Sequence, residues 1–146
     1  MPRVIAGIDG SDHSQRALEW AVGEAAARHL PLIAINVYQP VARVWGSAIA
    51  DQEDPDLAEH ARKAAQEQVD EAVARSGESR PESVTVRVVR GLPSEELPGA
   101  AGDADTIVVG SRGAGGFAQL LLGSVASHLA HHAHCPVVII PAEDRR

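Results

Sequence analysis

Glycine and serine residues recur at a fixed spacing late in the sequence, where they could hold phosphate groups. Gly110 and Gly113 follow an apolar run, and Gly123 and Ser124 stand at the start of a helical pattern. Glycine lets a ligand approach the backbone closely. The first N–H groups of a helix are unpaired and lie at the positive end of its dipole. The amides of Ser124 and Val125 could therefore bind phosphate without a lysine.

Two better-known phosphate motifs do not fit this stretch. The P-loop needs a lysine after its last glycine, and the only lysine in the sequence is Lys63. Gly113, Gly115 and Ala118 spell the dinucleotide pattern G-x-G-x-x-A. That pattern should open the first strand–helix–strand unit and be followed about 20 residues later by an acidic residue. The next acidic residue here is Glu143, beyond the last predicted strand, so we reject both motifs.

The composition favours one soluble domain spanning residues 1–146 and excludes several classes of function. The net charge is −7 and no basic cluster interrupts it, which argues against binding to nucleic acid or an anionic membrane. The apolar runs are too short to span a bilayer, and the N-terminus lacks the pattern of a secretory signal. A single cysteine, Cys135, excludes an internal disulfide framework. We therefore predict a cytoplasmic protein.

The candidate residues need elements that bring them together. Apolar runs rich in β-branched residues predict buried strands over 3–8, 32–37, 84–89, 106–109 and 137–140. The third run alternates partly, which favours a position near a sheet edge. Amphipathic patterns predict helices over 14–29, 56–75, 94–101 and 124–132. Strands that alternate with helices indicate an α/β fold with an open parallel sheet, which binds ligands beyond the carboxyl ends of its strands.

Several features have ordinary structural interpretations that remain open. Gly110 could simply terminate a strand, Ser124 could be only a helix N-cap, and Asp9 could cap the turn that follows it. Ser94 is a plausible N-cap for the third helix, whose length Pro98 and Gly99 leave in doubt. The residues 40–55 read as a loop that could cover the site. The histidines at 128, 131, 132 and 134 have helical spacings but no completing zinc ligands, which favours an exposed surface.

The spacing G-x2-G-x9-G-[ST], formed by Gly110, Gly113, Gly123 and Ser124, resembles the nucleotide signature of the universal stress protein family. The opening VIAGIDGSDHSQRALEWA resembles the first strand, acidic loop and helix of that family, and CPVVIIP resembles its closing strand. The likeness covers the whole chain as one copy of the domain. It implies a Rossmann-like fold with five parallel strands in the order 3-2-1-4-5 and helices on both faces.

The resemblance also implies roles for individual residues in an ATP site. Asp9 would lie near the ribose and near phosphates that carry Mg²⁺, and the backbone of Val37 would face the adenine edge. Gly110 and Gly113 would hold the ribose and phosphates, and the segment 123–125 the outer phosphates. Arg112 is a further candidate for a phosphate contact. The whole predicted ATP site comprises Gly7, Ile8, Asp9, Val37, Val109, Gly110, Arg112, Gly113, Gly123, Ser124 and Val125.

The resemblance implies an ATP-binding regulatory protein of the stress response, with at most slow hydrolysis and no predicted catalytic residue. It also implies a homodimer, for which residues 137–140 would supply a short apolar edge strand. The alternative is an ATP-consuming enzyme such as an ATP pyrophosphatase. The stretch DGSDHS at residues 9–14 loosely resembles the SGGxDS loop of those enzymes. Of the paired glycines in that loop only Gly10 is present, and no lysine, general base or nucleophile arrangement accompanies it. An interaction module without nucleotide would leave the glycine spacing unexplained.

Overall fold

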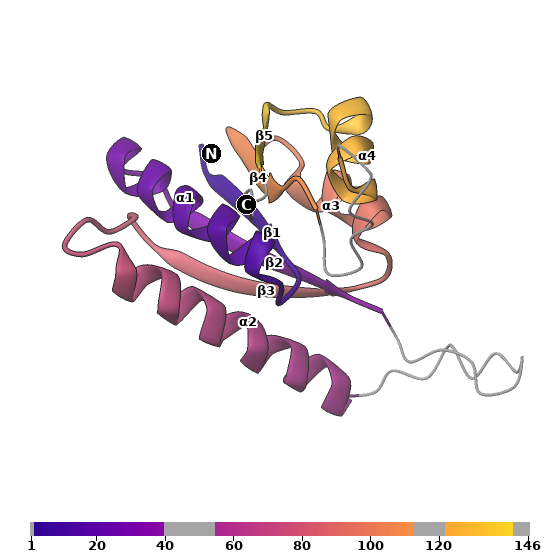
Figure 1. Ribbon diagram of the computed structural model, residues 1–146, viewed down its shortest axis with the longest axis horizontal. Helices are drawn as coiled ribbons and strands as arrows, with labels where there is room; N and C mark the ends of the chain where they lie inside the picture. Colours follow the sequence, from indigo (N-terminus) through magenta and orange to yellow (C-terminus); the bar gives the residue numbers. More distant parts are fainter. Residues whose placement is uncertain (1, 40–54, 113–121, 142–146) are drawn as a thin grey trace, which may run out of the picture.

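The computed structural model describes residues 2–39, 55–112 and 122–141. Strands and helices alternate along these residues (Figure 1). Their order is β1 (Val4–Ile8), α1 (Asp12–Arg28), β2 (Leu32–Tyr38), α2 (Pro55–Arg75), β3 (Val84–Arg90), α3 (Pro93–Ala101), β4 (Thr106–Gly110), α4 (Ser124–His132) and β5 (Val137–Ile140). The predicted elements are thus present, with ends that differ by one or two residues. Most of the loop predicted over 40–55 lies outside the described residues.

All strands pair in parallel in one five-stranded sheet, and their order β3-β2-β1-β4-β5 confirms the predicted fold. The central strand, β1, is buried along its whole length. The partly alternating run forms β3, which lies at an edge as its pattern predicted. The order reverses on either side of β1, so the loops that follow β1 and β4 meet at the same end of the sheet.

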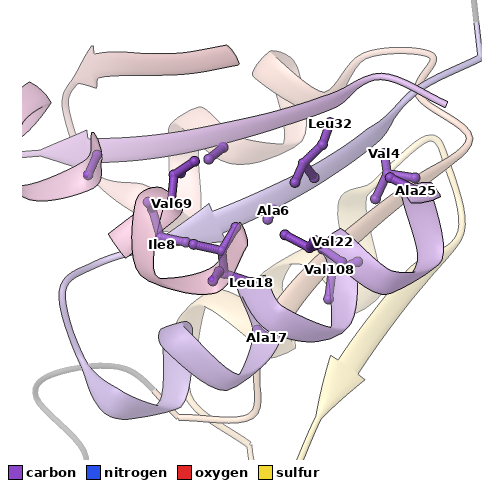
Figure 2. Close-up of a cluster of buried hydrophobic side chains, with 14 residues drawn as sticks. Val4, Ala6, Ile8, Ala17, Leu18, Val22, Ala25, Leu32, Val69 and Val108 are labelled. Carbon is purple, nitrogen blue, oxygen red and sulfur yellow. The ribbon is translucent and has the colours of Figure 1, made fainter. Parts of the chain in front are cut away.

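Side chains alternate across the sheet and build a hydrophobic core on each face. One core joins α1 and α2 to the sheet through residues such as Leu18, Val22 and Val69, which Figure 2 shows beside Ala6 of β1. The other core joins α3 and α4 to the opposite face. Figure 1 shows these two helix layers. Because both faces are covered, the strands carry apolar residues in continuous runs rather than in strict alternation.

The start of α3 corrects one prediction. The N-cap is Leu92 rather than Ser94, and Pro93 occupies the first helical position, where its missing N–H costs no hydrogen bond. The helix continues through Pro98 to Ala101. A proline at this position removes one backbone hydrogen bond, while Leu97 and Ala101 are both buried and hold the helix on the sheet.

None of the helices in the described parts of the chain combines the length and hydrophobicity needed to cross a bilayer.

Candidate functional site

A cavity of about 70 Å³ lies where β1 and β4 end and α4 begins. It brings together three predicted stretches that are far apart in the sequence, 7–9, 109–112 and 123–125. The lining residues are Gly7, Ile8, Asp9, Ser14, Leu97, Val109, Gly110, Arg112, Gly123, Ser124, Val125 and Ala126. The cavity therefore lies at the carboxyl ends of adjacent parallel strands, where α/β sheets bind ligands.

One predicted site residue that the structure describes, Val37, does not line this cavity. The side chain of Val37 is only 7% exposed and belongs to the core under α3 and α4. Its strand runs past the last β1–β2 pair, Ile8 with Asn36, so Val37 lies beyond the end of β1. Gly113 belongs to the segment 113–121, outside the described residues.

Three lining residues were missed by the sequence reasoning, namely Ser14, Leu97 and Ala126. Ser14 lies in the first turn of α1 and Ala126 in the first turn of α4. Both positions could have been found from the predicted helix starts, because first-turn residues lie beside the preceding strand ends. Leu97 carries no such signal, since its apolar side chain reads simply as a core residue.

The loop between β1 and α1 is organised by hydrogen bonds around Asp9. The Asp9 Oδ1 atom accepts hydrogen bonds from the Ser11 backbone N–H at 2.9 Å and from Ser11 Oγ at 2.5 Å. Ser11 is the N-cap of α1, and its Oγ accepts from the Ser14 N–H at 3.1 Å. Asp9 therefore does have the capping role that the sequence left open, while it also lines the cavity.

The start of α4 corrects the prediction for Ser124. The N-cap is Gly123, and Ser124 is the first helical residue. Among the described residues no side chain makes a capping hydrogen bond there, because glycine has none to offer. The Gly123 N–H donates to the Ser111 carbonyl at 2.5 Å, which ties the helix start to the end of β4. The first turn of α4, which no described side chain caps, thus faces the cavity with its backbone amides and the positive end of its dipole.

Gly110 is required by the packing of the protein itself. A Cβ atom on Gly110 would lie 3.0 Å from the carbonyl oxygen of His13 and 3.2 Å from that of Arg112. Both are backbone atoms, and the first belongs to α1. The end of β4 thus approaches the first turn of α1 so closely that a Cβ atom at Gly110 would force the backbone to shift by a few tenths of an ångström. The glycine at this position has a structural cause whether or not a ligand binds.

Gly7 makes room for two side chains that line the cavity. A Cβ atom there would lie 3.0 Å from Leu97 Cδ1 and 3.1 Å from Val109 Cγ1. These are side-chain atoms that line the cavity. The missing side chain of Gly7 therefore lets Leu97 and Val109 pack directly against the backbone of β1 at the cavity wall.

Arg112 brings a cation to the cavity. Its Nε atom is buried and has no hydrogen-bond partner among the described residues. A buried donor left without a partner costs about 1–3 kcal/mol. A bound anion would supply the missing acceptor. The described residues include no group of three or more histidine, cysteine, aspartate or glutamate side chains that could hold a metal.

A parallel α/β sheet with a cavity at the ends of its central strands defines the chain as a Rossmann-like domain. The family model described as "Universal stress protein family" matches residues 1–141. The chain belongs to this family.

The similar proteins include the universal stress protein Rv1996 of Mycobacterium tuberculosis, which is 34% identical over 154 residues. The alignment covers 97% of this chain and 49% of that protein. The chain thus spans about half the length of the curated relatives it matches.

Solved structures of universal stress proteins share the fold. UspA from Lactobacillus plantarum superimposes with a TM-score of 0.73 at 24% identity, covering 95% of this chain and 97% of that one. A universal stress protein in complex with cAMP gives a TM-score of 0.68 at 29% identity, with 95% of both chains covered. An Arabidopsis thaliana family member with AMP bound gives 0.60 at 18% identity, covering 98% and 93%. Neighbours in this fold therefore bind adenine nucleotides.

Proposed function

We propose that this chain binds ATP at the cavity and acts as a regulatory protein of the stress response, which changes state when the nucleotide binds. The observation that carries the proposal is the buried Nε of Arg112, which has no partner among the described residues, in the same cavity as the start of α4, which no described side chain caps. Both features favour an anion, and phosphate satisfies several donors at once. The neighbours with bound cAMP and AMP support an adenine nucleotide as the source of that phosphate.

The size of the cavity bears on how the nucleotide would lie. Sites for small molecules usually enclose about 300–1,000 Å³, whereas the described residues enclose about 70 Å³. The phosphate end fits best, because Arg112 and the start of α4 supply its donors. The ribose and base would then extend past the cavity, and Val37 beyond the end of β1 is the proposed contact for adenine.

Asp9 carries the one carboxylate among the described lining residues. Mg²⁺ in nucleotide sites is often held by one or two carboxylates together with phosphate oxygens and water. Asp9 therefore fits a Mg²⁺ ion that arrives with the nucleotide. It does not form a metal site by itself.

The alternative, an ATP-consuming enzyme, has less support from this cavity. The Ser14 Oγ atom already donates to the Ser11 carbonyl at 3.0 Å and accepts from the Asp9 N–H at 3.2 Å, so it is not poised as a nucleophile. The Asp9 carboxylate is engaged with Ser11. These side chains can orient a nucleotide, and we propose binding with at most slow hydrolysis. The net charge of −7 disfavours nonspecific binding to nucleic acid or to an anionic membrane, and we propose a cytoplasmic location from the single cysteine.

The binding proposal predicts that the purified protein carries or takes up ATP. Denaturing the protein and separating the released small molecules by chromatography should recover ATP, and calorimetry on stripped protein should detect ATP binding. Titrations with AMP and cAMP would rank the adenine nucleotides. If neither released nucleotide nor a binding isotherm is found, the proposal is wrong. Multiple-turnover release of pyrophosphate would favour the enzyme instead.

We also propose a homodimer through β5, an edge strand of the described sheet. Pro136 and Ile140 direct their carbonyls to β4, where they accept from the Ile107 and Ser111 N–H groups. Because alternate residues of a strand face opposite sides, the intervening Val137 and Ile139 direct their N–H and C=O groups to the open edge. A second copy could pair with these groups.

The dimer proposal predicts a dimeric mass in light scattering at micromolar concentrations. Ile139→Pro removes one N–H from the open edge and should shift the mass towards the monomer. Circular dichroism of the variant checks that it remains folded. A monomeric mass for the unsubstituted protein over the same range would contradict the proposal.

A further inference from the structure

Gln68, on α2, hydrogen-bonds to the loop that carries Asp9. Its Oε1 accepts from the Gly10 backbone N–H at 3.1 Å. Its Nε2 donates to Ser14 Oγ at 3.2 Å and to Gln15 Oε1 at 3.1 Å. The Gln15 side chain returns a hydrogen bond to the Gln68 carbonyl at 3.1 Å. One side chain of α2 thus links Gly10 in the loop between β1 and α1 to the first turn of α1.

These contacts fall on the residues that follow Asp9 in the sequence. Gly10, the next residue, has a φ of +85°, which glycine adopts without strain. The Asp9 N–H donates to Ser14 Oγ, the same atom that Gln68 contacts. Ser14 is only 4% exposed, so few waters can replace a lost partner there. The turn that aims Asp9 at the cavity is therefore stabilised from α2.

Gln68 lies on the far side of this loop from the cavity. It belongs to the wall of a separate, polar groove of about 350 Å³ between α1 and α2, which also includes Gly10 and Gln15. Asp9 and Ser14 line the cavity at the ends of β1 and β4, but Gln68 does not. Any effect of Gln68 on a nucleotide must therefore pass through the loop.

We infer that Gln68 is a positioning residue that holds Asp9 and Ser14 in their binding geometry and thereby raises nucleotide affinity. The inference rests on the proposed ATP site. Asp9 and Gly10 are exposed and bury no apolar side chain that would keep the turn in place. Without Gln68 the loop would become ordered only when the ligand binds. The entropic cost of ordering it would then make the binding free energy less favourable.

The test compares Gln68→Met with Gln66→Met on the same helix. Methionine keeps the length of glutamine and removes its hydrogen bonds. Gln66 is the matched control, because it is exposed and its one side-chain hydrogen bond within the described parts of the chain is local, to Asp70 of α2 at 3.0 Å. Gln68→Met is expected to weaken ATP binding about 10-fold in calorimetry, the equivalent of one or two net hydrogen bonds. Gln66→Met should bind ATP as the unsubstituted protein does.

Hydrogen exchange in the ligand-free protein separates positioning from general destabilisation. In Gln68→Met the Gly10 amide should exchange at least several-fold faster, while core amides such as that of Val22 keep their rates. Should Gln68→Met not fold, Gln68→Asn, which is one methylene shorter, gives the same comparison. Unchanged Gly10 exchange with unchanged ATP affinity would overturn the inference. If the unsubstituted protein binds no adenine nucleotide, the proposed function is overturned instead. Faster exchange of the Gly10 amide in Gln68→Met would even then support the conclusion that Gln68 stabilises the loop.

Discussion

Gly110→Ala is expected to lower the free energy of unfolding by about 1–3 kcal/mol, the usual cost of overpacking a closely packed site. The added Cβ would lie 3.0 Å from the carbonyl oxygen of His13. That atom belongs to the backbone of α1, so it cannot move aside as a flexible side chain would. Urea unfolding followed by circular dichroism measures the change.

Gly23→Ala is the matched control for this substitution. Gly23 lies within α1, and a Cβ atom there would have no neighbour within 4 Å. Alanine is favoured over glycine inside a helix by about 0.5–1 kcal/mol, so this variant should be more stable than the unsubstituted protein. The two glycine-to-alanine changes are thus expected to act in opposite directions. Equal urea midpoints for both variants would contradict the close approach of β4 to α1.

The packing around Gly110 changes what the glycine pattern indicates. The family resemblance implied that this glycine would hold the ribose and phosphates, while the sequence alone also allowed a simple strand end. The distances to His13 and Arg112 show that the protein needs it for a helix–strand contact. Glycine at this position is therefore not by itself evidence of a ligand. The case for a phosphate depends more on Arg112 and on the start of α4.

The fold could be predicted because its signals are distributed over whole elements. Apolar runs and amphipathic stripes identified every described strand and helix, and the family resemblance supplied the strand order. The helix starts were less accurate. Ser94 and Ser124 are good capping residues by type, yet the caps are Leu92 and Gly123. A cap depends on the backbone torsions where the chain enters the helix, and these follow from the neighbouring packing more than from one side chain.

The candidate site was predictable as far as it depends on adjacent strand ends. Asp9 follows β1 and Gly110 is the last residue of β4, and these two strands pair in the sheet, so the proximity of the two residues follows from the topology. The contact of Gln68 with Gly10 joins residues that are 58 positions apart. It depends on how α2 packs beside α1, and no spacing in the sequence encodes it. Long-range side-chain contacts of this kind are what the sequence reasoning could not supply.

Arg112→Met is expected to weaken ATP binding about 10- to 100-fold, because a hydrogen bond to a charged group contributes about 1.5–3 kcal/mol. The same change should not lower the stability of the ligand-free protein, because the buried Nε has no partner among the described residues. Removing an unsatisfied donor relieves a cost instead. Weaker binding without a loss of stability is expected of a residue whose buried donor is satisfied only when an anion binds.

Two further variants separate the charge of Arg112 from its geometry. Arg87→Met removes a positive charge from an exposed position on β3, and it controls for the change in net charge. It should bind ATP almost as tightly as the unsubstituted protein. Arg112→Lys keeps the charge but loses the planar fork of donors, so we expect an intermediate affinity. If Arg112→Met and Arg87→Met bind ATP equally well in calorimetry, Arg112 does not contact the phosphates. The uncapped start of α4 would then be the remaining anion-binding feature of the cavity.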